Sequence, residues 1–373
     1  MSRRRVASRP RSGRQLRIAV AVTSTEYGGA EKYLVDLYRE LTARFSVTVA
    51  IVGGFPGWPP EIGCVLRSRG NLAKLTSNER IWPQIPRLVR ITASQVRHLS
   101  RVDFDLVHMQ YKREQVFLSP FVAPRIPVVW TEHGDLPTRL PAPLVRMYDR
   151  NARHVGIVSI ADHVHASLED RGVRNILIRN PIPERPQRTA NSNSGMFFGH
   201  SGRRVFLYVG RLHASKRIDL LLGVAEAMPE DIFVLAGEGP MRQEMERLAP
   251  RNVRFLGHVA DVYPLYDTAT AVILTSGAAA NEGSPFAMLE ARGAGLPVIV
   301  MADSAAAREA SSIGCVVAEP TVGSIVAVAS GLTDRERWSL HDVLARERSN
   351  EAWASAHMDY FQSRANPAAP EGQ

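Results

Sequence analysis

Residues 16–41 read LRIAVAVTSTEYGGAEKYLVDLYREL, and this stretch decides the fold class. Its first part, Leu16 to Thr23, is mostly apolar, which is typical of a strand buried on both faces of a parallel sheet. Gly28 and Gly29 then begin a helix with one apolar face. That face comprises Ala30, Tyr33, Leu34, Leu37, Tyr38 and Leu41. A strand, a glycine turn and a helix in this order predict the first unit of a parallel α/β sheet.

The same alternation of strands and helices continues along the chain. In the first half we predict strands over 46–52, 105–110, 126–131, 155–159 and 175–179. A second start follows, with a strand over 204–209, a turn at Gly210 and a helix from about Lys216 to Ala227. Further strands are predicted over 232–235, 253–256, 271–275, 297–301 and 315–317. Two similar halves are implied, and ligands of such sheets bind beyond the carboxyl ends of the strands.

The chain length and composition accommodate two domains with large cores, since 373 residues contain 45% hydrophobic residues. We expect a disordered basic tail over 1–15, a first domain over 16–180 and a second domain over 203–349. Between the domains, 181–202 is rich in Pro, Asn and Ser, which indicates a linker. A helix over 350–364 carries aromatic residues, and we expect it to pack back on the first domain.

The positive charge of the chain belongs mainly to its first residues. The net charge is +9, and seven arginines with no acid lie between Met1 and Arg17, which leaves 9 − 7 = +2 elsewhere. Such a tail suits either a solvated end or peripheral contact with an anionic membrane. No motif for binding nucleic acid follows it, so we expect no nucleic-acid partner.

The cysteines and the hydropathy indicate the compartment. Cys64 and Cys315 lie in different predicted domains without metal-binding spacing, so neither a disulfide framework nor a zinc site is expected. The longest early apolar run, Ile18 to Val22, is too short for a signal peptide, and no stretch approaches the ~20 residues of a membrane span. We therefore expect a cytoplasmic protein, with any membrane contact peripheral and at the inner face.

Two carboxylates eight residues apart flank a predicted helix start in Glu282-Gly283-Ser284-Pro285-Phe286-Ala287-Met288-Leu289-Glu290-Ala291. Ser284 suits the N-cap and Pro285 the first helical position, so the free backbone amides there should point outward. At ~1.5 Å per residue, Glu290 lies roughly 7 to 8 Å further along the axis. This arrangement suits a sugar nucleotide. One carboxylate can accept from the hydroxyls of the sugar and the other from those of the ribose, and the amides between them can bind the phosphates. The alternative is an acidic helix start with an unrelated surface glutamate.

Two cations are predicted at the carboxyl edge of the second sheet. Arg211 follows the turn glycine of that sheet's first strand, and Lys216 lies near the start of the next helix. Together with helix-end amides they would offset the charge of a diphosphate. The competing interpretation is that both are ordinary solvated surface residues.

Several motifs now resemble one family, the family-four retaining glycosyltransferases. In the second half these are Val209-Gly210-Arg211-Leu212 with Lys216, Leu235-Ala236-Gly237-Glu238-Gly239-Pro240, Phe255-Leu256-Gly257-His258, Ser276, the stretch from Glu282 to Ala291, and Gly295-Leu296-Pro297-Val298. In the first half they are Gly28-Gly29-Ala30-Glu31, Asp105-Leu106-Val107-His108 and Thr131-Glu132-His133-Gly134. The likeness covers nearly all of the second half and less of the first.

The resemblance implies a GT-B fold, in which two Rossmann-like domains face each other across a cleft, the first on the acceptor side and the second binding a nucleotide sugar. It further implies retaining, metal-independent transfer of a hexose from a nucleoside-diphosphate sugar to a hydroxyl acceptor, without a further cofactor. The acceptor would be a glycolipid, a polysaccharide or a metabolite, and a lipid-linked acceptor would suit the basic tail.

Site roles follow from matched positions. The implied catalytic residues are Arg211 and Lys216 on the diphosphate, Glu282 on the donor sugar, and His133 on the transferred sugar. The implied donor-binding residues are Glu290 at the ribose, the segment Gly283, Ser284, Pro285 and Phe286, around which free backbone amides assist, Gly257 and His258 near the base, and Gly28 and Gly29 where backbone approaches donor or acceptor.

The chain departs from the family in two places. Residues 303–309 read Asp-Ser-Ala-Ala-Ala-Arg-Glu where relatives commonly have a glycine pair, and Ser284 replaces a bulky apolar residue. The DxD pattern Asp103-Phe104-Asp105 precedes a strand, which favours an acidic cap over a metal site. Three alternatives stay open: a sugar-nucleotide epimerase, a glycoside hydrolase with paired carboxylates, and an inactive protein that binds nucleotide sugar.

Overall fold

The computed structural model describes residues 15–25, 27–67, 85–136, 140–184, 202–332 and 342–366. The expected basic tail, apart from residue 15, and most of the expected linker lie outside these ranges. The chain divides into two compact units. The first comprises Met1–Ile160, Val164–Ile178 and Trp353–Gln373, and the second comprises Ala161–His163 and Arg179–Ala352.

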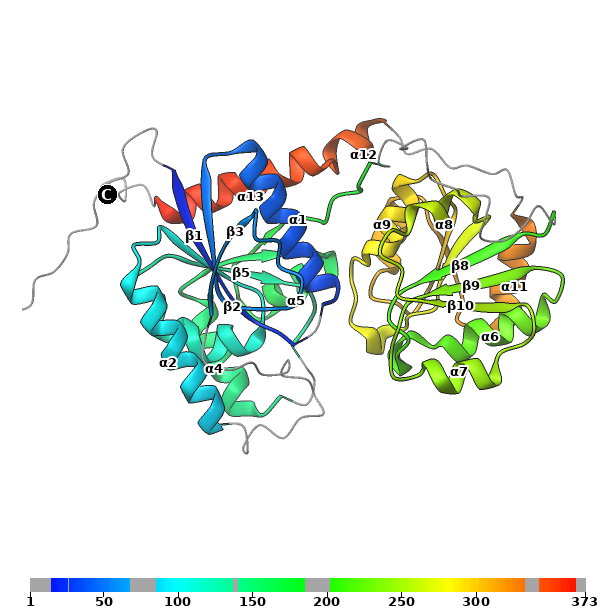
Figure 1. The fold of residues 1–373 in the computed structure, drawn as a ribbon, viewed down its shortest axis with the longest axis horizontal. Coiled ribbons are helices and arrows are strands. Elements are labelled where there is room, and N and C mark those ends of the chain that lie inside the picture. The colour runs from blue at the N-terminus through cyan, green and yellow to red at the C-terminus, as the bar shows by residue number, and fades with distance from the viewer. Residues whose placement is uncertain are drawn as a thin grey trace, which may run out of the picture. The chain divides into compact units, whose positions relative to one another are not determined.

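The first unit contains a seven-stranded sheet among its described residues, with the order β3-β2-β1-β4-β5-β6-β7 (Figure 1). Every pair of neighbouring strands is parallel. The strands are β1 (Leu16–Thr23), β2 (Val47–Gly54), β3 (Gly63–Arg67), β4 (Leu106–Met109), β5 (Val128–Glu132), β6 (Gly156–Ser159) and β7 (Ile176–Leu177). The strand order reverses at β1 and β4, so a ligand crevice is expected at their carboxyl ends.

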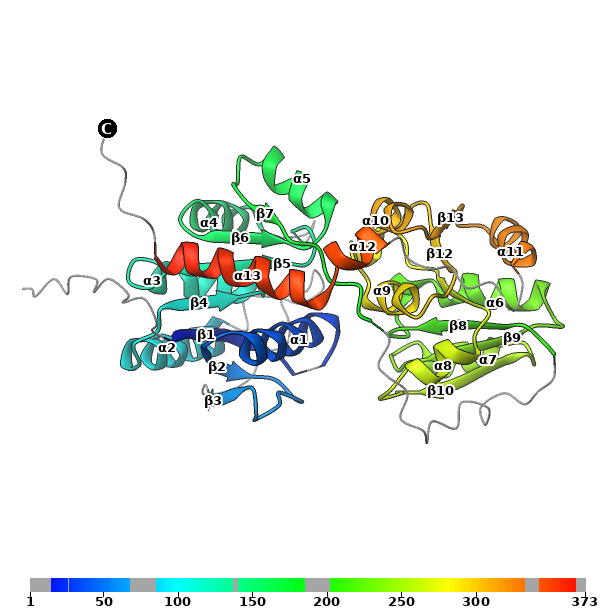
Figure 2. The same ribbon diagram turned by 90° about the horizontal axis from the view of Figure 1, so that it is seen from above.

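Helices cover both faces of this sheet (Figures 1 and 2). They are α1 (Gly29–Arg44), α2 (Ile85–Arg101), the π-helix η2 (Glu114–Leu118), α3 (Ser119–Val122), α4 (Ala142–Ala152), α5 (Asp162–Asp170) and α13 (Asn350–Ala365). The apolar face predicted for α1 is largely confirmed, since Tyr33, Leu34, Leu37, Tyr38 and Leu41 are fully buried. From Trp353 onward, α13 belongs to the first unit, although it is last in the sequence.

The second unit repeats this plan with a parallel sheet in the order β10-β9-β8-β11-β12-β13. Its strands are β8 (Val205–Val209), β9 (Ile232–Ala236), β10 (Val253–Gly257), β11 (Ala271–Leu274), β12 (Val298–Met301) and β13 (Val316–Ala318). Its helices are α6 (Ile218–Ala227), α7 (Arg242–Leu248), α8 (Tyr263–Thr268), α9 (Phe286–Gly293), α10 (Ala307–Ser312), α11 (Val322–Gly331) and α12 (Asp342–Glu347). Two parallel, helix-covered sheets confirm the predicted α/β class with two Rossmann-like domains.

Two helix starts differ from the sequence expectation. Lys216 ends a 3₁₀ turn over Ala214–Lys216, and α6 begins only at Ile218 because Arg217 is in the left-handed conformation, with φ 49° and ψ 51°. Pro285 has extended ψ of 127° and is itself the N-cap of α9, which begins at Phe286. The prediction that Ser284 caps this helix was therefore wrong, because Ser284 lies one residue too early.

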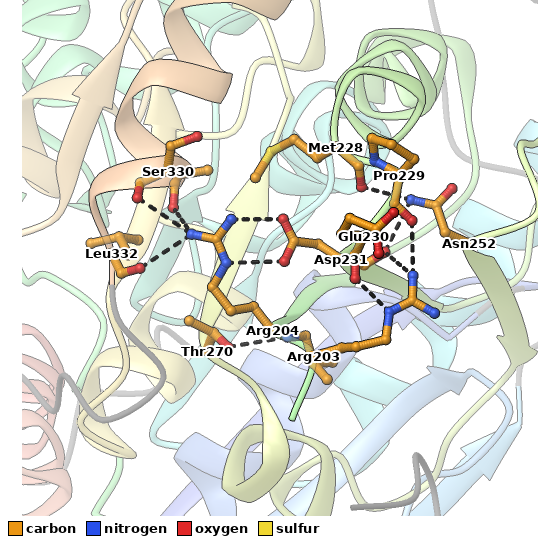
Figure 3. A network of polar contacts seen from close by, with 12 residues as sticks. Arg203, Arg204, Met228, Pro229, Glu230, Asp231, Asn252, Thr270, Ser330 and Leu332 are labelled. Atoms are coloured by element: carbon orange, nitrogen blue, oxygen red, sulfur yellow. Dashed lines mark hydrogen bonds and ion pairs between the residues drawn. The ribbon is translucent and has the colours of Figure 1, made fainter. Parts of the chain in front are cut away.

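A polar network holds the amino end of β8 to the surrounding helices (Figure 3). Arg204 donates from Nε and Nη2 to the two carboxylate oxygens of Asp231, over 3.0 and 2.7 Å. Its Nη1 donates to the carbonyls of Ala329 and Leu332 at the end of α11, over 3.1 and 3.3 Å. The Asp231 side chain is only 9% exposed, so its charge depends on this arginine for compensation.

Replacing Arg204 with Met should destabilise the second unit by roughly 2 to 4 kcal/mol, because a nearly buried carboxylate and two helix-end carbonyls lose their donor. Urea unfolding followed by circular dichroism measures the loss. Arg203→Ala is the matched control, since the exposed Arg203 donates to the carbonyls of Pro229 and Glu230 and leaves no buried charge behind. Equal losses of unfolding free energy in the two variants would contradict the role of Arg204 in compensating the buried Asp231 charge.

Candidate functional site

Glycine turns form the carboxyl edge of the second sheet. Gly210 and Gly237 follow β8 and β9, and Gly257 ends β10, with φ of 156°, 151° and 74°. A Cβ at Gly237 would lie 1.9 Å from the carbonyl oxygen of Gly210, so only glycine fits where these turns touch. The Gly237 N–H donates to the Gly257 carbonyl over 2.7 Å. The glycines of the sequence motifs thus place three loops at one edge.

Arg211 lies on the first of these loops and is exposed. Its carbonyl accepts a hydrogen bond of 3.1 Å from the hydroxyl of Tyr208 on β8. Burial raises the pKa of Tyr208 well above its usual value, and the nearby Glu282 carboxylate adds to this rise. The phenol therefore stays protonated and serves as a fixed donor under the Arg211 turn.

Lys216 and Glu282 are brought together by the fold. The ammonium group of Lys216 forms an ion pair with the Glu282 carboxylate, and the two side chains are 13% and 41% exposed. The carbonyl of Lys216 accepts a hydrogen bond of 2.6 Å from the Thr275 hydroxyl at the end of β11. A cation and a carboxylate that are 66 positions apart in the chain thus occupy one place at the sheet edge.

The loop that carries Glu282 is anchored by residues that sequence reasoning missed. The Ser284 carbonyl accepts from the Asn180 side-chain amide over 3.3 Å. The Asn180 carbonyl accepts in turn from Nε and Nη2 of Arg348, over 2.9 and 2.6 Å. These residues lie near the two ends of the second unit, and no local sequence pattern marks them.

A buried acid completes this anchor. Nη2 of Arg348 also donates to Glu309 over 2.6 Å, and the carboxylate is 2% exposed. Burial raises the pKa of Glu309, while the Arg348 charge opposes the rise. The backbone of Ser284 is therefore connected through Asn180 and Arg348 to a buried acid.

Glu290 lies on α9 and is only 7% exposed. The hydroxyl of Tyr266 on α8 donates to its Oε2 over 3.2 Å. Burial, and then the Glu290 charge, raise the pKa of Tyr266 well above its usual value, so this donor stays protonated. Sequence reasoning did not identify Tyr266 as a partner of this carboxylate.

The remaining donor-side candidates follow the same edge. His258 comes directly after Gly257 and is exposed. Gly283 is buried, and Pro285 and Phe286 are partly buried at the start of α9. The predicted residues of this unit thus lie on the loops after β8, β10 and β11 and on α9, and the ion pair joins two of them, Lys216 and Glu282.

In the first unit, Gly28 and Gly29 lie at the amino end of α1. Gly28 is the N-cap, and its N–H donates to the Glu31 carboxylate over 2.9 Å. Glu31 is fully buried and also accepts from the Tyr111 hydroxyl. Gly29 is exposed as the first helical residue. Since Glu31 is held by this capping role, the motif is partly structural.

His133 directly follows β5, where its ring is held on two sides. Its Nε2 lies 3.0 Å from Oε1 of Gln110, which follows β4. Its ring packs edge-on against Tyr33 of α1, with 4.8 Å between centroids and 88° between planes. The Tyr33 hydroxyl hydrogen-bonds His357 of α13 over 2.7 Å. The predicted site histidine thus lies against a buried aromatic cluster.

That cluster contains two histidines with no exposed surface. His108 hydrogen-bonds the Tyr38 hydroxyl through Nδ1 and the Thr131 hydroxyl through Nε2, each over 2.8 Å. Burial lowers the pKa of His108 to about 3 and that of His357 to about 4. Both side chains are therefore neutral hydrogen-bonding groups of the core near pH 7.

The DxD pattern, Asp103-Phe104-Asp105, lies at the amino ends of the strands of the first sheet, opposite the carboxyl ends where His133 lies. Asp105 precedes β4, and its carboxylate accepts from the backbone N–H of Arg17 at the start of β1, over 2.8 Å. It therefore joins the amino ends of two strands, as an acidic cap does.

Within the described ranges, no group of three or more His, Cys, Asp or Glu residues is arranged to hold a metal ion. None of the described helices has the length and apolarity to span a membrane.

The fold and these glycine-edged loops define the class of GT-B glycosyltransferases. Residues 27–187 match the family model described as Glycosyltransferase Family 4, and residues 203–334 match the model described as Glycosyl transferases group 1. The chain belongs to this family of group 1, family-four glycosyltransferases. No curated protein matches the chain in sequence.

Solved structures share the whole fold at low sequence identity. Sucrose-phosphate synthase from Thermosynechococcus elongatus aligns with TM-score 0.72 and 15% identity, covering 94% of this chain and 99% of its own. HepE of Anabaena in complex with UDP-glucose aligns with TM-score 0.73 and 17% identity, covering 94% and 100%. A glycosyltransferase from Rickettsia africae aligns with TM-score 0.72 and 12% identity, covering 95% and 100%.

The buried histidines predict that the first unit loses stability in mild acid. Unfolded histidines take up protons near pH 6.5, whereas His108 and His357 resist protonation in the folded state until about pH 3 and 4. Their contribution is complete above pH 6.5 and is lost as the pH falls from 6.5 towards 4, by up to about 1.4 kcal/mol per pH unit for each histidine.

Urea unfolding at pH 7 and pH 5 measures this loss. Tryptophan fluorescence reports on the first unit through Trp58, Trp130 and Trp353 when Trp338, which belongs to the second unit, is replaced with Phe in every protein compared. His357→Gln should be less stable than the wild type at pH 7 and should lose less stability between the two pH values. An unchanged pH dependence in this variant would contradict the role of His357.

Proposed function

We propose that the protein is a retaining glycosyltransferase that transfers a hexose from a nucleoside-diphosphate sugar to a hydroxyl acceptor. The observation that carries the proposal is the pairing of Lys216 with Glu282 at the glycine-rich sheet edge. Membership of the family supports glycosyl transfer itself. The UDP-glucose complex of HepE supports uridine diphosphate hexoses as the first donors to test.

Arg211 and Lys216 are proposed to bind the diphosphate of the donor. Both cations lie on loops at the carboxyl ends of parallel strands, where such sheets bind ligands. As the bond between the sugar and the phosphate breaks, negative charge gathers on the leaving group and the cations bind it more strongly. One well-placed donor of this kind contributes about 3 kcal/mol to stabilising the transition state. Charge compensation by side chains is the basis for proposing that transfer does not need a metal.

The carboxylates are proposed to bind the two sugars of the donor. Glu282 accepts from hydroxyls of the transferred hexose, and Glu290 accepts from the ribose, with its carboxylate oriented by Tyr266. The loop from Gly283 to Phe286 contributes backbone amides, and Gly257 with His258 lies at the base. Each role rests on the matched motif together with the placement of the residue at this sheet edge.

Retention of the anomeric configuration is proposed to follow a same-face route. The bond from the anomeric carbon to the leaving phosphate oxygen breaks, and the acceptor oxygen forms a bond to that carbon on the same face. The acceptor proton passes to the leaving phosphate, so no enzyme base is required. His133 is proposed to contact the transferred sugar, and Gly28 and Gly29 to allow backbone to approach donor or acceptor.

A lipid-linked acceptor has support from the surface of the first unit. Helix α2 contains no acid, and Arg87, Arg90, Arg97 and Arg101 are exposed on it. The opposite face buries Leu88, Ile91 and Leu99, and Val89 is 61% exposed among the arginines. A basic helix surface of this kind attracts anionic lipid. Together with the basic tail, it supports peripheral contact with the cytoplasmic face of a membrane.

The proposed function is tested with a panel of uridine and guanosine diphosphate hexoses. Release of the nucleoside diphosphate is measured with and without crude cell lipid, and the anomeric configuration of the product is determined by NMR. Release that depends on added acceptor supports transfer. Conversion of the donor sugar without acceptor would indicate an epimerase, and binding without release would indicate an inactive binding protein.

Lys216→Ala should lower kcat by roughly 100-fold, because about 3 kcal/mol of transition-state stabilisation is lost. The unfolding free energy should change little, since the pair is partly exposed. Single-turnover release of nucleoside diphosphate from bound donor measures the effect. The control is Arg44→Ala, which removes an exposed ion pair with Glu40 on α1. Unchanged release from Lys216→Ala would refute the role of Lys216.

Glu290→Ala should raise the apparent KM for the donor at least tenfold, because the proposed ribose contact is lost. Tyr266→Phe keeps the ring but removes the hydrogen bond to Glu290, and it should raise the same KM by a smaller factor. Initial rates over a range of donor concentrations give both values. A donor KM that neither substitution changes would exclude a ribose role for Glu290.

A further inference from the structure

The backbone is left-handed next to both members of the Lys216–Glu282 pair. Among the described residues, the two non-glycine residues with positive φ are Arg217 and Asn281, each at 49°. Arg217 directly follows Lys216, and Asn281 directly precedes Glu282. Asparagine adopts this conformation readily, whereas for an arginine it is unfavourable and persists where surrounding contacts hold it.

The contacts that hold Arg217 come from two other loops. Its Nη1 and Nη2 each donate to one carboxylate oxygen of Asp303, both over 2.8 Å. Its Nε donates to the Thr275 carbonyl over 2.8 Å. One planar guanidinium thus joins the loop after β8 to the loops after β11 and β12.

The geometry leaves no room for a side chain beneath the guanidinium. A Cβ at Gly277 would lie 2.8 Å from Cζ of Arg217, inside the range that real contacts avoid. The Gly277 backbone itself has φ of −99°, which alanine adopts without strain. An alanine here would therefore fit the turn but displace the guanidinium.

Asp303 lies on the loop after β12 and is the partner of Arg217. The left-handed arginine is thus bonded to a carboxylate 86 positions further along the chain. The contact is specific to the guanidinium, because a lysine cannot donate in parallel to both carboxylate oxygens.

We propose that Arg217 and Asp303 form a clamp that positions Lys216 for the donor diphosphate. Arg217 is a positioning residue, because it acts through the backbone of Lys216. The Thr275 hydroxyl donates to the Lys216 carbonyl while the Thr275 carbonyl accepts from Arg217, so the Lys216 turn is fixed from both sides. This inference rests on the proposed function, since it assigns Lys216 to the donor.

The clamp serves position rather than stability. The Arg217 and Asp303 side chains are 27% and 45% exposed, and exposed ion pairs contribute little to folding. The left-handed backbone at Arg217 itself opposes folding. A pair that served only stability would gain little from its exposed charges and would lose some of that gain to the left-handed backbone. A role in positioning accounts for both the strain and the three hydrogen bonds.

Two substitutions separate these roles. Arg217→Gly removes the guanidinium and relieves the backbone, so the urea midpoint should stay at or above that of the wild type while kcat falls at least tenfold. Gly277→Ala keeps every charge but displaces the guanidinium, and it should lower kcat by a similar factor. Arg217→Lys should lower kcat about as much as Arg217→Gly, because an ammonium group cannot replace the bidentate guanidinium. Gly323→Ala is the matched control, because a Cβ there meets nothing within 4 Å.

Binding of UDP, measured by calorimetry, supplies a readout that is independent of turnover. Both Arg217→Gly and Gly277→Ala should weaken it relative to the wild type and Gly323→Ala. Wild-type kcat and UDP affinity in both variants would overturn the clamp, as would a fall in stability that matches the loss of activity. If the wild-type protein binds UDP but does not cleave any donor sugar nucleotide, the proposed function fails. The UDP affinities of the variants then decide alone whether the clamp exists.

Discussion

The ion pair between Lys216 and Glu282 is the contact around which the loops of the second unit are arranged. Holding opposite charges together at a sheet edge requires each backbone to arrive in a fixed direction. Left-handed residues beside both partners supply that direction, and glycines at the ends of β8, β9 and β10 allow the loops to approach. The charge of the site is therefore inseparable from the backbone geometry that presents it.

The two units share one strand plan but stabilise their functional edges differently. In the second unit, arginines bonded to carboxylates and carbonyls hold the loops, as at Arg217 and Arg348. In the first unit, buried ion pairs such as Arg113–Glu114 are joined by neutral hydrogen bonds among tyrosine, histidine and threonine, with Tyr33 and His108 among them. The Arg217–Asp303 pair is accessible to solvent, so salt should weaken it more than the buried pairs of either unit.

Most strands could be predicted because burial on both faces of a parallel sheet leaves a local, apolar signal. β3 was missed because it lies at the sheet edge and only its middle is partly apolar, with Cys64 and Val65 exposed. The sequence motifs predicted one site for Lys216, Glu282 and Glu290, and the structure pairs the first two. It did not indicate Asn180 or Arg348, because a contact between residues 168 positions apart leaves no periodic trace in the sequence. The left-handed Arg217 was equally hidden, since its conformation depends on Asp303.

Helix α13 has a consequence for how the protein is made. Its residues from Trp353 complete the first unit, and His357 bonds to Tyr33 across 324 positions of the chain. During synthesis the second unit, continuous from Arg179 to Ala352 apart from three earlier residues, emerges whole before this helix leaves the ribosome. Domains generally fold as they are translated, starting from the amino terminus. Here the half that is translated first completes its core last, after the residues from Trp353 onward have been made.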